Sequence, residues 1–161
     1  PDLLKMMADM NTFLTPTFEV YEFHSTISAP HIQERAKALM QVHEDSLHQA
    51  LAAGVKVTAG TDAGGFVHAD NAREIQLMVE RGMSPLQAIQ TGTGWAAECI
   101  GMDKVIGTVE KGKEADFLVV DGDPLGDIGV LRDRSRIKLV MKAGETMVDK
   151  LPASLPQAVG D

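Results

Sequence analysis

The stretch at residues 55–65 limits what this chain can fold into more than any other part of it. It begins with an apolar, β-branched run at 55–60, in which hydrophobic residues alternate with smaller or polar ones. Such alternation favours a short strand that packs closely on both faces. Asp62 follows the run and precedes a glycine pair. In a barrel of parallel strands, catalytic groups project from this end of a strand, although the spacing fits equally well an aspartate that begins a turn.

The chain on either side of this stretch has helical patterns. Apolar residues recur at helical spacing over 30–54, which predicts a long helix, and a β-rich run at 12–18 predicts a strand before it. Asn71 with Glu74 three residues later predicts a helix that begins with a capping box, and Ser84 begins a second pattern of this kind.

From Ile106 onward the hydrophobic period changes from helix to strand. Glycine turns separate four short runs with β character, at 106–109, 115–120, 137–141 and 146–148. This change predicts a small β domain at the end of the chain.

Four segments together resemble a known family. They are residues 60–64, 68–74, 82–89 and 107–121, and they occur in the family's order with similar spacing. In these segments the chain resembles the C-terminal part of metal-dependent amidohydrolases, and its closest branch looks like the imidazolonepropionase and prolidase-like members.

The resemblance implies an α/β fold, in which residues 1–105 form the C-terminal part of a (β/α)8 TIM-type barrel. Residues 106–150 would form part of a small β-sandwich domain, and 151–161 a tail. A complete barrel needs roughly 250 residues, more than the 161 present. We therefore expect the chain to be the C-terminal portion of a longer protein.

The chemistry that the resemblance implies centres on Asp62. In the family, the aspartate that ends the eighth barrel strand binds the catalytic zinc and relays a proton from the bound water, and Asp62 matches that position. A metal lowers the pKa of bound water, and a carboxylate beside it can accept the proton. The implied reaction is hydrolysis of a carbon–nitrogen bond in an amide, a cyclic amide or a small peptide. His68 and Tyr21 are expected in loops at the same end, where each either contacts substrate or is simply a partly exposed loop residue.

Most of the family's metal ligands have no counterpart here. They include a His-x-His pair, and no His-x-His occurs in this chain. His43 and His48 do not replace it, because residues five apart on a helix diverge by about 140°. A catalytic zinc usually needs three protein ligands and one open position. We therefore expect zinc as the cofactor of the complete enzyme, and no activity from this chain alone.

The net charge of −8 argues against nucleic acid or an anionic membrane surface as a partner. No apolar run approaches the roughly 18 residues of a membrane span, and the single Cys99 fits a reducing compartment. These features favour a cytoplasmic protein whose partner is a small-molecule or peptide substrate. Assembly as a homo-oligomer, or pairing with the missing N-terminal part, is a further expectation.

Two other functions stay open at this point. An incomplete barrel leaves a sheet edge unpaired, and such edges associate with other chains. The chain would then be a non-catalytic assembly or interaction module. In the second alternative the hydrolase scaffold is kept but the bond differs, as in the deaminases and other hydrolases of the same superfamily.

Overall fold

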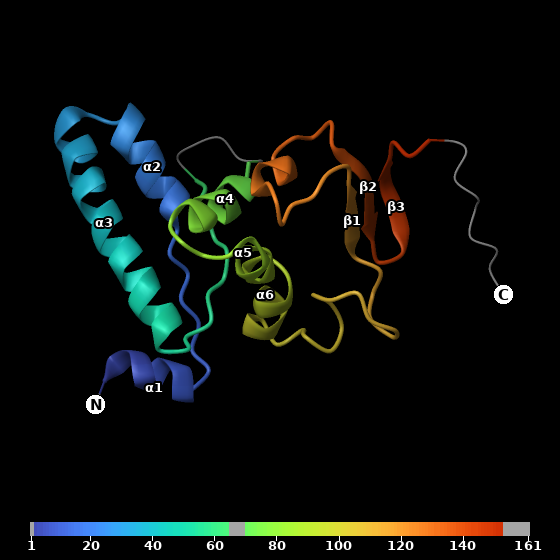
Figure 1. Ribbon diagram of the computed structural model, residues 1–161, viewed down its shortest axis with the longest axis horizontal. Helices are drawn as coiled ribbons and strands as arrows, with labels where there is room; N and C mark the ends of the chain where they lie inside the picture. The colour runs from blue at the N-terminus through green and yellow to red at the C-terminus, as the bar shows by residue number, and fades with distance from the viewer. Residues whose placement is uncertain (1, 65–69, 153–161) are drawn as a thin grey trace.

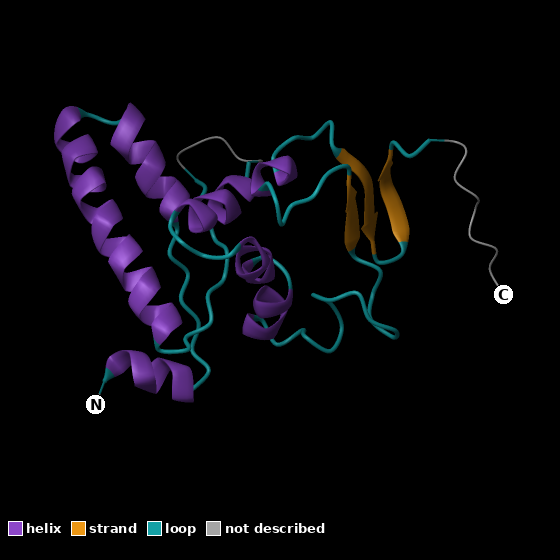
Figure 2. Cartoon of the chain, viewed as in Figure 1, coloured by secondary structure: helices purple, strands orange, loops and turns teal. Residues whose placement is uncertain are grey.

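The computed structural model describes residues 2–64 and 70–152 (Figure 1). Within them the α-helices are α1 (Leu3–Asp9), α2 (Phe18–Ile27), α3 (Pro30–Ala52), α4 (Ala72–Glu80), α5 (Pro85–Thr91) and α6 (Gly94–Cys99). The strands are β1 (Phe117–Val120), β2 (Ile137–Lys142) and β3 (Glu145–Asp149), and a 3-10 helix, η1 (Ile128–Leu131), precedes β2. The α-helices occupy one part of the molecule and the three strands another (Figure 2).

The two segments expected as neighbouring barrel strands lie side by side and run in the same direction. Leu14 and Val57 form an isolated parallel bridge. The Leu14 N–H donates to the Lys56 carbonyl at 3.0 Å, and the Thr58 N–H donates to the Leu14 carbonyl at 2.9 Å. Parallel segments need a long crossover between them, and α2 with α3 provides it. The structure therefore supports the parallel pairing, while the predicted full-length strands are reduced to one bridge.

The crossover differs from the sequence expectation in one respect. Tyr21 is expected in a loop after the first strand segment, but it lies within α2. That prediction is wrong, because Phe18 is completely buried and begins a helix. The long helix predicted over 30–54 is confirmed as α3, with Pro30 in its first turn and the left-handed Gly54, at φ 81°, after its end.

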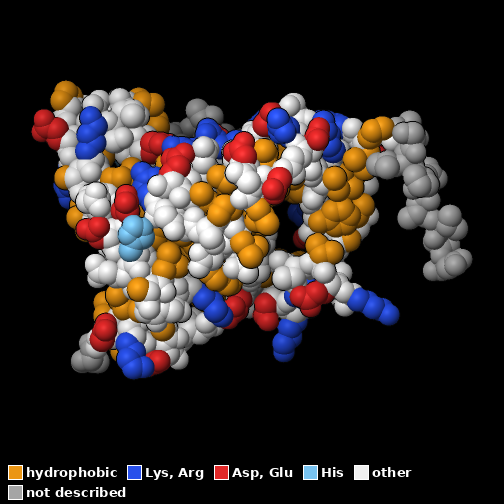
Figure 3. Space-filling view, in the orientation of Figure 1, with side chains coloured by type: hydrophobic (Ala, Val, Ile, Leu, Met, Phe, Trp, Pro, Cys, Tyr) orange, Lys and Arg blue, Asp and Glu red, His pale blue; other side chains and the backbone are white. Residues whose placement is uncertain are grey.

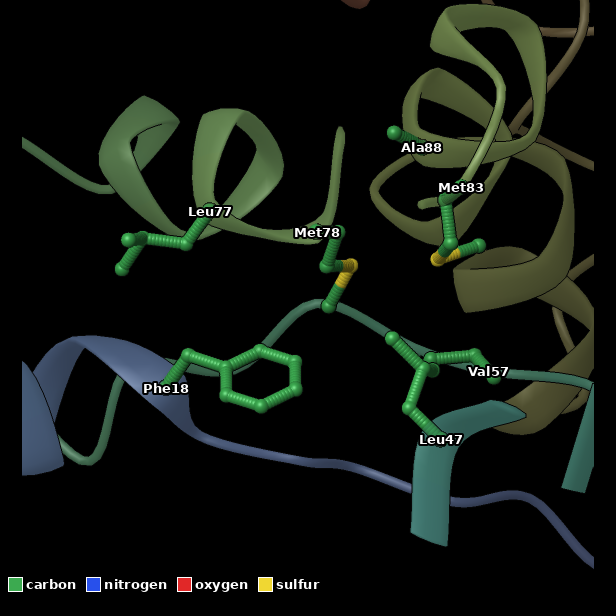
Figure 4. Packing of buried hydrophobic residues seen from close by; sticks show 7 residues of the cluster. All are labelled: Phe18, Leu47, Val57, Leu77, Met78, Met83 and Ala88. Atoms are coloured by element: carbon green, nitrogen blue, oxygen red, sulfur yellow. The ribbon is translucent and has the colours of Figure 1, made fainter. Parts of the chain in front are cut away.

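The main core lies where α2, α3, α4 and α5 meet the segment around Val57 (Figure 4). Its buried members are Phe18, Leu47, Val57, Leu77, Met78, Met83 and Ala88. Burial of each large apolar side chain contributes about 1.5–3 kcal/mol. The segment that leads to Asp62 is thus anchored in the core five residues before the carboxylate.

The three strands form one antiparallel sheet in the order β1-β2-β3. Val119 pairs with Leu139, and Val140 pairs with Val148. The strand predicted over 106–109 is wrong, since residues 106–108 form bends and residue 109 has no regular secondary structure. Figure 3 shows hydrophobic side chains gathered over this sheet. Leu118 on β1 and Met147 on β3 are more than half exposed. The second layer of a β-sandwich, and the domain boundaries, stay predictions.

The 3-10 helix η1 attaches the sheet to α4. Its Ile128 and Val130 are buried. Arg132 directly follows η1. Its guanidinium forms an ion pair with Asp70 at 2.6 Å and donates to the side chain of Gln76 at 2.8 Å. No helix among the described residues is long and apolar enough to cross a membrane.

Candidate functional site

Asp62 lies just past the paired segment, at the end where both parallel segments finish. It is exposed, and its backbone is left-handed at φ 54°. A positive φ is uncommon outside glycine, although aspartate adopts it more readily than most residues. Within residues 2–64 and 70–152, no hydrogen bond or ion pair involves the Asp62 side chain, so its carboxylate is available to a ligand or a reacting group.

Close packing fixes the backbone that leads to Asp62. The hydroxyl oxygens of Thr15 and Thr58 lie 2.7 Å apart and share a hydrogen bond between the two segments. A Cβ added at Gly60 would lie 2.6 Å from the methyl carbon of Thr15. Only glycine leaves room for this approach, so the two segments are held together directly before the carboxylate.

The helix α2 begins at this same end, and a residue far along the chain caps it. Its preceding residue, Thr17, has φ 52° and makes no side-chain capping bond. Instead the Phe18 N–H donates to Glu74 Oε1 at 2.9 Å, and the Glu19 N–H donates to Glu74 Oε2 at 2.8 Å. Glu74 is completely buried, and this burial raises its pKa to about 7, against the two hydrogen bonds, which lower it.

Glu19 is a second buried carboxyl group beside Glu74. Only 8% of this residue is exposed, and its Oε2 has no hydrogen-bond partner in the part of the chain that the structure describes. Burial is the largest cause that raises the Glu19 pKa, and the negative charges of Asp70 and Glu22 add to it. The charges of Arg132 and Arg73 act in the opposite direction.

Arg73 joins α2 to α4 through charged hydrogen bonds. Its guanidinium donates to Glu22 at 2.6 and 2.9 Å, and to Glu80 at 2.7 and 3.1 Å. A hollow of about 230 Å³ lies beside this network. The residues that line it are Glu19, Glu22, Phe23, Thr26, Ile27, Asp70, Arg73 and Arg132.

The other residues that the sequence singled out are dispersed. Tyr21 is half-buried, and its ring packs against that of His43 with centroids 4.2 Å apart. His48 instead contacts the Arg81 carbonyl at 2.6 Å, so the two histidines diverge as expected. His68 falls outside the described residues. The substrate-binding roles of Tyr21 and His68 stay predictions.

The acidic and histidine side chains do not assemble into a metal site in the described ranges. Among these residues, no group of three His, Cys, Asp or Glu side chains is placed to hold a metal ion. The side chain of Asp62 is thus one candidate ligand without the further ligands that a catalytic zinc requires.

Comparison with known proteins identifies the family. The model of the amidohydrolase family matches residues 1–147. The chain belongs to the amidohydrolase family. Ochratoxinase from Aspergillus niger is 35% identical over 115 residues, which make up 69% of this chain and 23% of that enzyme.

Solved amidohydrolase-type structures share the fold. A prolidase complexed with N-methylphosphonate-L-proline superposes with a TM-score of 0.81 at 30% identity, covering 91% of this chain and 37% of the prolidase. A Xaa-Pro dipeptidase with methionine in its active site gives a TM-score of 0.78 at 34% identity, covering 90% and 37%. The chain thus spans well under half the length of these relatives. Their prolidase-like character agrees with the branch indicated by the sequence, and the similarity supports a partial α/β fold of this family.

The sequence did not reveal the role of Glu74. It predicted that Glu74 would complete a capping box with Asn71 on its own helix, but the Asn71 side chain makes no capping bond. The expected capping box on α4 is therefore wrong. The available signal was a glutamate among the apolar residues of α4. A carboxylate buried there needs hydrogen-bond donors, which predicts a contact with another part of the chain.

Proposed function

We propose that the protein containing these residues hydrolyses the carbon–nitrogen bond of an amide or peptide, and that Asp62 accepts a proton in that reaction. Membership of the amidohydrolase family, together with ochratoxinase and prolidase relatives, supports hydrolysis of amide or peptide bonds as the reaction class. The placement of Asp62 supports its assignment as the residue that accepts the proton. It is an exposed carboxylate directly after a core-anchored segment, at the end where parallel segments finish.

The residues that the structure describes do not by themselves fit a zinc ion, because no three His, Cys, Asp or Glu side chains among them are placed to hold one. We therefore propose that Asp62 is this chain's contribution to the site and that groups elsewhere complete it. The Thr15–Thr58 hydrogen bond and the glycine at position 60 would hold the Asp62 backbone in place. An exposed, unpaired carboxylate is suited to take a proton from an attacking water.

The first test is proline release from a Xaa-Pro dipeptide such as Met-Pro, by the protein that carries these residues. We expect Asp62→Asn to lower kcat by about a hundredfold or more, as is typical when a general base is removed. Asp45→Asn is the matched control, because Asp45 is an exposed aspartate on α3 whose carboxylate accepts a hydrogen bond from Gln41. This control should keep the wild-type rate.

Two results would contradict the proposal. One is wild-type turnover in the Asp62→Asn protein with an unchanged thermal unfolding midpoint. The other is release of ammonia from an aminated heterocycle with no cleavage of any amide, which would favour the deaminase alternative. A protein that shows neither reaction but forms a defined oligomer by light scattering would favour the assembly-module alternative.

A further inference from the structure

Thr17 connects the first parallel segment to α2 and has an uncommon backbone conformation. Its φ of 52° and ψ of 48° lie in the left-handed region. Among the described residues, the other non-glycine residues with a positive φ are Asn11, Asp62 and Ala143, so Thr17 is the only β-branched one. A β-branched side chain disfavours this conformation, and residues held in it cluster at functional sites, where the surrounding structure enforces it.

Contacts on both sides enforce the conformation of Thr17. Pro16, directly before it, is buried, and Nδ1 of His43 on α3 donates to the Pro16 carbonyl at 3.2 Å. The N–H groups of the two residues after Thr17 each donate to one oxygen of Glu74 on α4, at 2.9 and 2.8 Å. The helices α3 and α4 thus hold the peptide units that precede and follow Thr17.

The Thr17 hydroxyl has no structural role in the described residues. A threonine directly before a helix usually accepts, with its side chain, from an N–H of the first turn. Thr17 makes no such bond, and Glu74 accepts from the first turn instead. Within 2–64 and 70–152 the half-buried Thr17 side chain makes no other hydrogen bond, whereas the Thr15 hydroxyl is bonded to that of Thr58. Thr17 therefore keeps a hydroxyl that can donate to a ligand and accept from one.

This free hydroxyl lies at the same end of the paired segments as Asp62. Thr15 packs against Gly60, where an added Cβ would lie 2.6 Å from the Thr15 methyl carbon. The two segments run in parallel, so two further residues along each lead to Thr17 and Asp62 at about the same level. Both residues are left-handed. This end of the molecule thus presents one free hydroxyl and one free carboxylate.

We propose that Thr17 is a substrate-contacting residue of this site and that Glu74 is the residue that positions it. The Thr17 hydroxyl donates a hydrogen bond to an oxygen of the amide or peptide substrate, at the end where Asp62 accepts the proton. This inference rests on the proposed function, which supplies the substrate. The fixed backbone favours the contact, because a group that is already in place loses little conformational freedom on binding.

The experiment is steady-state cleavage of Met-Pro by the protein that carries these residues. Thr17→Val replaces the hydroxyl by a methyl and keeps the β-branch, so it should lower kcat/KM by about tenfold, mainly through KM, as is typical when one neutral hydrogen bond is lost. Thr17→Ser keeps a hydroxyl and should stay close to wild type. Thr146→Val is the matched control, because Thr146 is an exposed threonine on β3, outside the helical part that holds Asp62.

A double-mutant cycle tests the positioning role of Glu74. An amide at this position has one acceptor oxygen in place of two, so Glu74→Gln should raise KM in the protein with Thr17. The same change should raise KM much less in the Thr17→Val background, because the hydroxyl that Glu74 positions is then absent. A purely structural role of Glu74 would raise KM equally in both backgrounds. If Glu74→Gln does not fold, the comparison of Thr17→Val with Thr17→Ser still decides.

Two results with an active wild type would overturn the inference alone. One is an unchanged kcat/KM in Thr17→Val, and the other is an equal loss in Thr17→Ser and Thr17→Val. A wild type that does not cleave Met-Pro would instead overturn the proposed function, and this inference with it. The two failures are therefore distinguishable by the activity of the wild type.

Discussion

At the scale of single residues, the approach to Asp62 is governed by steric exclusion at Gly60. Thr15 is held on one side by its hydrogen bond to Thr58, and its methyl group fills the space beside Gly60. Well-packed interiors tolerate added atoms poorly, because neighbours must move or adopt strained rotamers. The position of the Asp62 backbone therefore depends on having glycine at position 60, two residues earlier.

We expect Gly60→Ala to lower the free energy of unfolding by about 1–3 kcal/mol, since its new methyl group overlaps that of Thr15. Thr15→Ser in the same protein removes the opposing methyl while keeping the hydroxyl, and should restore most of the loss. Chemical denaturation measures both. Gly64→Ala is the control, because its added Cβ meets no heavy atom within 4 Å. A stable Gly60→Ala protein, or no restoration in the double variant, would contradict this packing.

At the scale of elements, α2 and α4 are joined by side chains rather than by backbone pairing. Glu74 caps α2, and the Arg73 guanidinium connects Glu22 on α2 with Glu80 on its own helix. Hydrogen bonds with Arg73 are the largest cause that lowers the pKa of Glu22. A carboxyl group with a lowered folded-state pKa stabilises the fold above its ordinary value, and this stabilisation is lost as the pH falls through the lowered value.

For Glu22 the ordinary value is 4.5, which sets the pH window. Glu22→Gln should therefore lower the thermal unfolding midpoint at neutral pH, and its difference from wild type should shrink as the pH falls below that value. Thermal unfolding followed over this range tests the sign. Glu34→Gln, an exposed change on α3, should show no such pH-dependent difference. If the thermal unfolding midpoint of Glu22→Gln stays below that of wild type by the same amount down to acid pH, the ion pair with Arg73 is not the cause of the difference.

Local sequence patterns predicted the elements whose stabilising contacts are local. The long helix α3 follows from apolar spacing, and the capping box of α5 is confirmed, with Ser84 and Gln87 bonded in both directions. The sequence missed α2, since its cap comes from Glu74, 56 residues after Phe18. It also overstated the strands, because pairing at Leu14 and Val57 depends on tertiary contacts that periodicity does not encode.

At the scale of the whole molecule, the helical part and the sheet are connected through η1. The Arg132 guanidinium donates to both carboxylate oxygens of Asp70 and also to the side chain of Gln76 on α4. Asp70 and Gln76 flank the first turn of α4, which holds Glu74. The attachment of the sheet and the capping of α2 therefore involve the same short helix.

Arg132→Gln should increase hydrogen exchange in η1, because the substitution removes the ion pair with Asp70 next to this helix. The buried side chains of Ile128 and Val130 stay in place, so hydrogen exchange in α3 should be unchanged. Exposed ion pairs contribute at most about 1 kcal/mol, so the global unfolding midpoint should change little. Arg136→Gln is the matched control, since the Arg136 guanidinium bonds the Asp121 carbonyl within the sheet region. Equal exchange in η1 for both variants would argue against this attachment.

The central claim is that Asp62 is this chain's contribution to a hydrolytic site that other groups complete. The most direct measurement is the zinc content of the purified 161-residue protein, after exposure to zinc and removal of the excess, for wild type and Asp62→Asn. The account predicts far less than one zinc per folded chain in both proteins. Stoichiometric zinc in the wild type that is lost in Asp62→Asn would contradict it, because the site would then be complete within copies of this chain.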